Sequence, residues 1–345
     1  MALRIDVHTH LDTKPYLDIC VKYCQSPKFV KQGEYKYIMI EGDTVMGHHD
    51  LREAIDPDAR AEAIPKLGLD AQIISTPLPG AERFEKSLTV EVQELINNEL
   101  AAVCKKYSKV MPHFLCSLSW KDVDASLKEM KRAKSMGAVG ICCPSNIHGR
   151  AISDPEFEPI FAQAAELGMP LLVHPTVPLT GEAQNINGLP WQLYGFTLDT
   201  SMATMGCLFK GYLEKYPKLQ FMVCHTGGVI PFLPFRAANS YKKYAETYPG
   251  AKNWVKTTKP FIEYIKKIMF DNCQYWGPSF RCAYELVGAE GLYLGTDYPH
   301  RAGGDWNATS FIDAQDWLTE REKDMIKGEN VMRVMNFKLD ESLYR

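Results

Sequence analysis

Eight short apolar segments recur along the chain, separated by segments with helical periodicity, and this alternation limits the fold more than any other feature. Each apolar segment has the length and composition of a buried strand in a parallel sheet. The predicted strands cover residues 3–7, 69–76, 110–118, 138–143, 170–174, 219–225, 267–271 and 292–297. The predicted helices cover residues 58–67, 88–107, 125–136, 155–167, 199–216, 229–248 and 280–287, and the remainder through residue 336 is expected to be helical.

Two architectures alternate strands and helices in this way, the (β/α)8 TIM barrel and the open doubly wound sheet. No Gly-x-Gly-x-x-Gly motif follows the first strand, which weakens the doubly wound alternative. We therefore expect an α/β fold, a distorted TIM barrel, with residues 1–345 as a single domain. Residues 11–57 have weak periodicity, and we interpret them as an insertion after the first strand that lies over the barrel mouth.

Composition excludes several classes of function. The formal net charge is -3 over 345 residues, so there is no electrostatic case for binding nucleic acid. No run approaches the roughly 18 apolar residues that a membrane span needs, and no signal peptide is visible before the first strand, so we expect neither. Several of the ten cysteines lie inside predicted strands, without a Cys-x-x-Cys pair, which indicates reduced thiols in a cytoplasmic protein.

Histidines and an aspartate stand where predicted strands end. His8 and His10 point to one face because strand residues two apart share a side, and His174, His225 and Asp297 close the fifth, sixth and eighth strands. A single such histidine is ordinarily a core or surface residue. A barrel delivers the C-terminal ends of all its strands to the same face, however, so these five residues are expected to converge. Three histidines and a carboxylate form a metal site with open positions.

The motifs at these strand ends also carry a family resemblance. They are His8-Thr9-His10, His174-Pro175, Cys224-His225-Thr226-Gly227-Gly228 and Gly295-Thr296-Asp297-Tyr298-Pro299, supported by Leu189-Pro190-Trp191. The set resembles the amidohydrolase superfamily. Within it, the chain resembles the branch of metal-dependent decarboxylases that includes aminocarboxymuconate-semialdehyde decarboxylase and the hydroxybenzoate-type decarboxylases. The resemblance covers nearly the whole chain.

The resemblance implies one divalent metal ion bound by His8, His10, His174 and Asp297. It implies that His225 is a catalytic base beside the metal-bound water, and Asp297 is expected to shuttle a proton as well as bind the metal. Three imidazoles and a carboxylate suit zinc best, with manganese and iron as alternatives.

Substrate binding is expected to involve an arginine, because its planar fork grips both oxygens of a carboxylate. Arg236 stands eleven residues after His225, where the family resembled carries an arginine that reaches a neighbouring protomer, so we expect a homodimer or higher homo-oligomer. The resemblance also implies an arginine after the first strand; the candidates are His48 and Arg52, and spacing does not choose between them. Trp191 is a candidate aromatic wall.

The leading functional interpretation is a non-oxidative decarboxylase of an unsaturated or aromatic carboxylic acid. Alternatives are a hydrolase of the same superfamily that cleaves a lactone or amide, and a hydratase of ring-cleavage products. A non-catalytic binding protein on a barrel scaffold is a third alternative, which the intact ligand set disfavours. His49 and His300 have no assigned role at this point.

Overall fold

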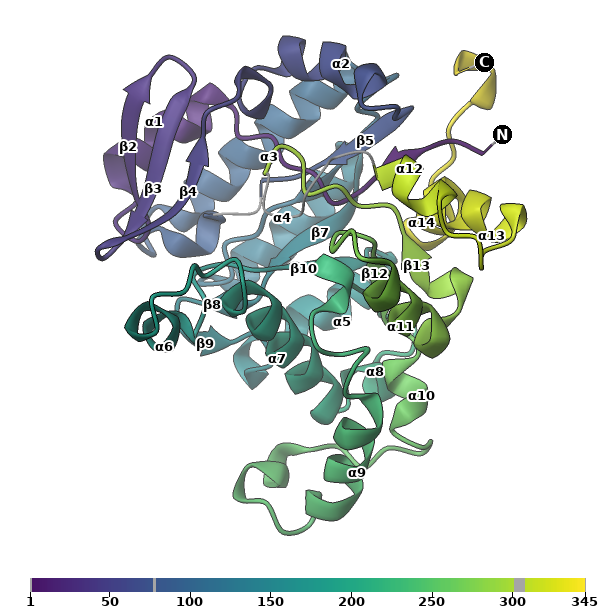
Figure 1. Ribbon diagram of the computed structural model, residues 1–345. Coiled ribbons are helices and arrows are strands. Elements are labelled where there is room, and N and C mark those ends of the chain that lie inside the picture. Colours follow the sequence, from purple (N-terminus) through teal and green to yellow (C-terminus); the bar gives the residue numbers. More distant parts are fainter. Residues whose placement is uncertain (1, 77–78, 301–307, 345) are drawn as a thin grey trace.

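The computed structural model describes residues 2–76, 79–300 and 308–344, and eight parallel strands form its central sheet (Figure 1). The strand order is β1-β5-β6-β7-β10-β11-β12-β13, so neighbours in the sheet follow one another along the chain. The strands are β1 Ile5–Asp6, β5 Ala71–Ile74, β6 His113–Cys116, β7 Ala138–Pro144, β10 Leu171–His174, β11 Phe221–Val223, β12 Met269–Asp271 and β13 Leu292–Tyr293. Each lies inside a predicted strand or overlaps it almost completely.

The first and last strands of this sheet also meet. The amide of Val7 donates to the carbonyl of Leu294 over 3.3 Å, and the amide of His10 donates to the carbonyl of Tyr298 over 2.8 Å. Thr9 and Tyr298 form an isolated parallel bridge. These contacts curl the sheet back on itself, which confirms the distorted (β/α)8 barrel and rules out the open doubly wound sheet.

Helices connect the strands and surround the sheet. They are α2 Pro57–Lys66, α3 Thr89–Lys106, α4 Val123–Ser135, α5 Glu158–Leu167, α6 Gly181–Ile186, α7 Gly195–Phe209, α8 Tyr212–Lys215, α9 Pro234–Tyr244, α10 Ile262–Ile265 and α11 Gly277–Val287, followed by α12 Ala308–Asp313, α13 Glu320–Asp324, a π-helical turn Met325–Glu329 and α14 Asn330–Val334. A short hairpin, β8 Asn146–Ile147 and β9 Arg150–Ala151, follows β7. Among the described residues, no helix is long and apolar enough to span a membrane.

Two predicted helices differ from the structure. The segment 199–216 is divided between α7 and α8, because Gly211 adopts a φ of 73° and a side chain there would collide with Val255. The segment 229–248 is helical only from Pro234, since proline suits the first turn and restricts the residue before it. The C-terminal helices agree with the prediction, although residues 301–307 lie outside the described residues.

The insertion has more structure than its sequence pattern predicts. It contains the helix α1 Lys14–Tyr23 and a separate antiparallel sheet of β2 Lys28–Gly33, β3 Lys36–Glu41 and β4 Thr44–His49. Both strand pairs contain an irregularity in register, which breaks the strict alternation by which a strand is recognised. In Figure 1 this sheet stands beside the barrel, next to α3, and is drawn in purple.

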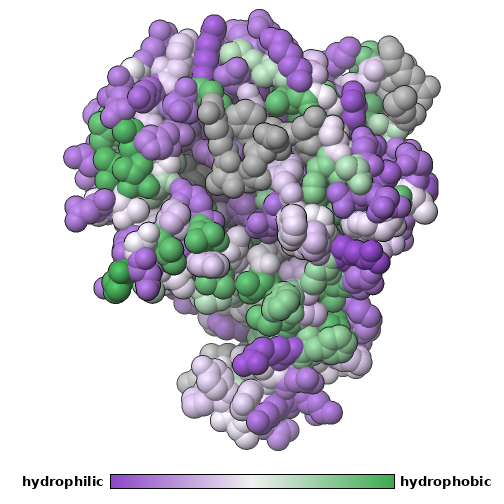
Figure 2. Space-filling view, in the orientation of Figure 1, coloured by the Kyte–Doolittle hydropathy of each residue, from purple (hydrophilic) through white to green (hydrophobic). Residues whose placement is uncertain are grey.

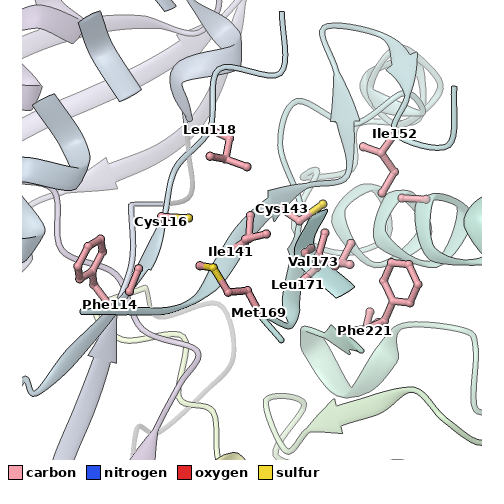
Figure 3. Close-up of a cluster of buried hydrophobic side chains, with 14 of the residues drawn as sticks. Phe114, Cys116, Leu118, Ile141, Cys143, Ile152, Met169, Leu171, Val173 and Phe221 are labelled. Atoms are coloured by element: carbon pink, nitrogen blue, oxygen red, sulfur yellow. The ribbon is translucent and has the colours of Figure 1, made fainter. Parts of the chain in front are cut away.

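Alternate residues of each barrel strand pack on opposite sides of the sheet. In β10, Leu171 and Val173 belong to the outer layer beneath the helices, whereas Leu172 packs inside the barrel. Figure 3 shows the outer layer around Ile141, Cys143 and Phe221. The inner layer includes Val331 and Met335 from the C-terminal helices. The barrel interior is therefore a packed core, which leaves the C-terminal ends of the strands as the place for a site.

Candidate metal centre and active site

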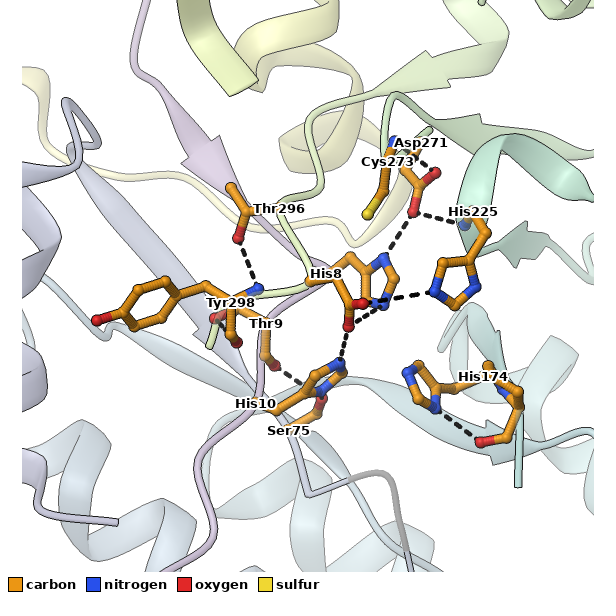
Figure 4. Close-up of polar contacts among 12 residues, drawn as sticks. His8, Thr9, His10, Ser75, His174, His225, Asp271, Cys273, Thr296 and Tyr298 are labelled. Atoms are coloured by element: carbon orange, nitrogen blue, oxygen red, sulfur yellow. Dashed lines mark hydrogen bonds and ion pairs between the residues drawn. The ribbon is translucent and has the colours of Figure 1, made fainter. Parts of the chain in front are cut away.

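Four of the residues predicted at strand ends lie together at the C-terminal end of the barrel. Figure 4 labels the three histidines among them. His8 and His10 follow β1, His174 ends β10 and Asp297 follows β13. The Nε2 atoms of His10 and His8 lie 3.1 and 3.3 Å from Oδ1 of Asp297, and ligand atoms of all four residues lie within 4.8 Å of one another. Zinc–nitrogen bonds of about 2.0–2.1 Å place neighbouring tetrahedral ligands about 3.3 Å apart, so this spacing suits a metal ion.

The hydrogen bonds of the three imidazoles fix which nitrogen carries the proton. Nδ1 of His8 donates to Oδ2 of Asp271 over 2.7 Å, and Nδ1 of His174 donates to the carbonyl of Pro175 over 2.9 Å, because both oxygens are acceptors only. Nδ1 of His10 lies 3.2 Å from the hydroxyl of Ser75, which itself donates to a backbone carbonyl and so accepts from the ring. In its neutral form each ring therefore has its lone pair on Nε2, the atom that a metal ion would bind.

Burial keeps two of these imidazoles neutral. It lowers the pKa of His10 to about 3 and holds the pKa of His174 well below its usual value. Nε2 of His174 is buried without a hydrogen-bond partner among the described residues, which is costly unless a ligand satisfies it. Burial alone acts to raise the pKa of Asp297, but His8 and the surrounding imidazoles bring it well below its usual value. The neutral imidazoles of His10 and His174 beside an ionised carboxylate fit a divalent cation.

His225 lies beside this group on its open side. Its Nε2 atom is 3.6 Å from Oδ2 of Asp297, whereas the imidazoles of His8 and His10 approach Oδ1. The side chain of His225 is 12% exposed and lines the adjoining cavity. The structure therefore places His225 next to the candidate metal ligands but outside the buried group of four.

A cavity of about 550 Å³ opens onto this group of residues. Barrel loops and the insertion both line it. The lining residues are Met39, Met46, Gly47, His48, Asp50, His174, Pro175, Pro190, Gln192, Leu193, Phe196, Thr197, His225, Cys273, Gln274, Asp297, Pro299 and His300. Its size and its mixture of apolar walls with a few polar groups are typical of a site for a small organic molecule.

The structure separates the two candidates for substrate binding in the insertion. His48 lies on β4 and lines the cavity. Arg52 is exposed, forms an ion pair with Asp56 at 2.6 Å and lies over the ring of Tyr35, so it is occupied away from the cavity.

We expect His48→Ala to raise KM several-fold with a smaller effect on kcat, because a side chain that contacts bound substrate chiefly affects binding. Arg52→Ala is the matched control and should leave both constants within twofold of wild type. Steady-state kinetics of the two variants measures this difference. An Arg52 variant that loses affinity while the His48 variant keeps it would reverse the assignment.

Trp191 and Arg236 lie outside the cavity of their own chain. Trp191 is buried, and its indole nitrogen donates to the carbonyl of Gly181 over 3.1 Å and to Oδ1 of Asn185 over 2.7 Å. Its neighbours Pro190 and Gln192 line the cavity. Among the described residues, Phe196 contributes the phenyl ring of the lining. The structure thus places Trp191 behind the wall rather than in it. Arg236 is exposed on α9.

Sequence patterns gave no reason to select Arg60, which is completely buried behind the site. Its guanidinium donates to the hydroxyl of Thr9 over 3.0 Å and to the carbonyl of His10, and it stacks on the ring of Tyr298 at 4.4 Å. It therefore connects the segments that carry His10 and Asp297. Arg60 lies within a predicted helix, and helical periodicity does not indicate such a role.

The two unassigned histidines lie next to each other. His300 lines the cavity, with its ring 5.4 Å from that of His10 and 5.7 Å from that of His49. His49 is buried, with Nε2 3.6 Å from Oδ2 of Asp12, and burial lowers its pKa to about 3. His300 therefore lies between the imidazole of His10 at the candidate metal centre and that of His49 in the insertion.

The amidohydrolase family model matches residues 5–337, so the chain belongs to the amidohydrolase family.

Two relatives and one solved structure illustrate the likeness. The chain is 26% identical to a 2-amino-3-carboxymuconate-6-semialdehyde decarboxylase from Dictyostelium discoideum, over 99% of this chain and 94% of that protein. It is 23% identical to a gamma-resorcylate decarboxylase from Rhizobium sp., over 82% and 87% of the two chains. The fold is similar to that of 5-carboxyvanillate decarboxylase from Novosphingobium aromaticivorans, a structure with manganese and 4-hydroxy-3-methoxy-5-nitrobenzoic acid, with a TM-score of 0.84, 21% identity and coverage of 97% and 96%.

Proposed function

We propose that this protein is a metal-dependent carboxy-lyase that removes CO2, without oxidation, from an unsaturated or aromatic carboxylic acid. The observation that carries the proposal is the convergence of four buried side chains that could hold a metal ion, beside a cavity that His225 also lines. The relatives described above, which are decarboxylases of carboxymuconate-type and hydroxybenzoate-type acids, support this reaction class.

His8, His10, His174 and Asp297 would hold one divalent metal ion. When bound, the ion supplies positive charge that stabilises negative charge developing on the substrate. We expect zinc first, since tetrahedral sites of imidazole and carboxylate ligands suit it. Manganese is supported by its presence in the 5-carboxyvanillate decarboxylase structure, and iron also binds such ligands.

Decarboxylation breaks the bond between a carbon and its carboxylate and leaves the electron pair on that carbon. One proton must then reach the carbon as CO2 departs. We assign His225 the role of a base that takes a proton from water in the cavity and returns it to this carbon; its side chain lines the cavity with Nε2 3.6 Å from Asp297. We assign Asp297 a second role as a proton shuttle. Histidine suits the task because its ordinary pKa is close to neutral.

The walls of the cavity favour a flat, largely apolar substrate. Met39 and Met46 come from the insertion, Leu193 lies between α6 and α7, and Phe196 lies in the first turn of α7. Methionine side chains adapt to planar groups, and the phenylalanine ring offers a stacking face. His48 and Asp50 add polar groups that suit ring substituents.

The decisive experiment measures CO2 release from a panel of hydroxybenzoates and carboxymuconate-type acids by purified, metal-loaded protein. We expect turnover with at least one of these acids, accompanied by one-for-one formation of the decarboxylated product. Activity confined to lactones or amides would identify the hydrolase alternative. Addition of water to ring-cleavage products, without CO2, would identify the hydratase.

We further propose a homodimer or higher homo-oligomer in which Arg236 enters the cavity of a partner. Arg236 stands on α9 among the exposed apolar residues Phe232 and Phe235, which are 79% and 72% exposed. Figure 2 shows hydrophobic surface in the lower centre of the view, over the elements between α7, α11 and α9. No lysine or arginine is among the described residues that line the cavity of one chain, so a partner's arginine is an available source of cation for a substrate carboxylate.

Mixing two impaired variants tests this arrangement. Arg236→Ala should lower kcat/KM by about one to two powers of ten, because it removes a charge-assisted hydrogen bond of about 1.5–3 kcal/mol. A mixed dimer of Arg236→Ala with His225→Ala contains one site with both residues intact, so activity should partly return. Native mass spectrometry of tagged chains monitors subunit exchange. Complete exchange without recovered activity would place Arg236 within its own site or outside catalysis.

We also propose that residues 1–345 act as one domain and that the protein works in the cytoplasm. The insertion supports the first statement because it contributes Met39, Met46 and His48 to the same cavity as the barrel loops. The cysteines support the second, since all ten are free thiols and nine of them are buried.

A further inference from the structure

We propose that Asp271 is a positioning residue that serves the candidate metal ligand His8 and the candidate acid-base His225 at the same time. The role at His225 rests on the proposed function, whereas the role at His8 rests only on the candidate metal centre. Asp271 ends β12 and is completely buried. It lies 263 residues from His8 and 46 from His225, and although it ends the predicted strand 267–271, its contacts could not be read from the sequence.

Both oxygens of the Asp271 carboxylate are fully used. Oδ2 accepts from Nδ1 of His8 over 2.7 Å and from the backbone amide of His225 over 3.0 Å. Oδ1 accepts from the backbone amides of Thr226 and Cys273, at 2.5 and 3.0 Å. Figure 4 shows this carboxylate between the imidazole of His8 and the backbone of His225.

The contact with His8 determines what that imidazole can bind. Because Nδ1 donates its hydrogen bond to Asp271, the neutral ring has its lone pair on Nε2, which faces Asp297. A carboxylate in this position fixes both the tautomer and the orientation of a ligating histidine. Without it, a proton on Nε2 would exclude His8 from a metal site.

The contacts with the backbone hold His225 in an unfavourable conformation. Four consecutive residues from His225 to Gly228 have positive φ, with values of 56° and 54° at the two that are not glycine. Residues with side chains adopt this region at a cost and need surrounding structure to hold them there. Asp271 accepts hydrogen bonds from the backbone amides of both His225 and Thr226. It therefore directs the imidazole of His225 towards Asp297.

Asparagine at position 271 separates these effects from a general loss of packing. The amide of asparagine has the shape of the carboxylate but only one acceptor oxygen. Since each oxygen of Asp271 accepts from two N–H groups, two of these four donors would face an NH2 group in the variant. Asp199→Asn is the matched control. Asp199 is equally a buried carboxylate, which accepts from Nδ2 of Asn146 over 2.9 Å and from the amide of Leu179 over 3.2 Å, and it lies outside the cavity lining.

We expect Asp271→Asn to weaken zinc binding by about 10- to 100-fold in competition with a chromogenic chelator, as loss of such partners does at other metal sites. At saturating zinc, kcat should remain depressed by about 10²-fold, because His225 is misplaced. Adding Asp271→Asn to His225→Ala should then cost zinc affinity again but little further turnover. Asp199→Asn should match wild type in both properties.

Wild-type affinity for zinc in a folded Asp271→Asn variant would overturn the role at His8. Full kcat at saturating zinc would overturn the role at His225. If the variant does not fold, nitrogen-15 spectra of the histidines in wild-type protein give the answer, with the His8 signals assigned by their loss in His8→Gln. Protonation of His8 at Nδ1 is expected, and protonation at Nε2 would contradict the proposal. The zinc and spectroscopic measurements need no substrate, so they remain informative even if decarboxylation is not found.

Discussion

His174→Ala is expected to abolish metal binding and, with it, turnover. His174 contributes a buried imidazole whose Nε2 atom has no hydrogen-bond partner among the described residues, and burial keeps that imidazole neutral. Removing it leaves two histidines and one carboxylate to hold the ion. Elemental analysis should find about one divalent ion per chain in wild type, and little in the variant after dialysis against a weak chelator.

His113→Ala is the appropriate control for that experiment. His113 begins β6, donates from Nδ1 to the carbonyl of Gly137 over 3.1 Å and packs against Phe337, away from the cavity. It should keep full metal content and most of its activity. Full metal occupancy in His174→Ala, or a crystal structure with the ion bound elsewhere, would show that the assigned ligand set is wrong.

His225→Ala is expected to keep its metal and to lose turnover by a factor of about 10² to 10⁴, the usual contribution of a general acid or base. The physical reason is position: Nε2 of His225 faces Oδ2 of Asp297 from the cavity, outside the group of four candidate ligands. Metal content and kcat, measured on the same preparation, test the retained metal and the lost turnover together. If metal and activity are lost in the same proportion, His225 is a ligand.

The barrel could be predicted because its strands are buried on both faces. Segments such as 171–173 and 221–224 are continuous apolar runs, and runs of this kind between amphipathic helices have few alternative structures. The gathering of His8, His10, His174 and Asp297 was predictable for the same reason, since parallel strands deliver their ends to one face.

The insertion and the substrate side of the cavity could not be predicted in the same way. Irregular register in β2, β3 and β4 obscures the period of two, so residues 11–57 gave no clear strands. Spacing could not choose between His48 and Arg52, because only the folded sheet shows that one faces the cavity and the other pairs with Asp56. Trp191 lies in a loop, where no periodicity predicts which side chain faces inward.

The polar residues that support the site are the hardest to find from sequence. Asp271 and Arg60 are each completely buried, and although Asp271 ends a predicted strand, the role of each is recognised only from its contacts. Their partners are distant in the chain or belong to the backbone, as with Asp271 and His8 or Arg60 and the carbonyl of His10. Local patterns carry no information about such contacts.

The candidate metal ligands also span the seam of the barrel, where the first and last strands meet. His10 and Asp297 stand 287 residues apart in the chain, yet their side chains approach within 3.1 Å. An ion bound by both would act as a reversible cross-link between the beginning and the end of the barrel, and would remove much of the conformational freedom that opens the seam. Binding of the metal would then also hold the barrel closed. The supply of metal would therefore govern the stability of the folded protein as well as its activity.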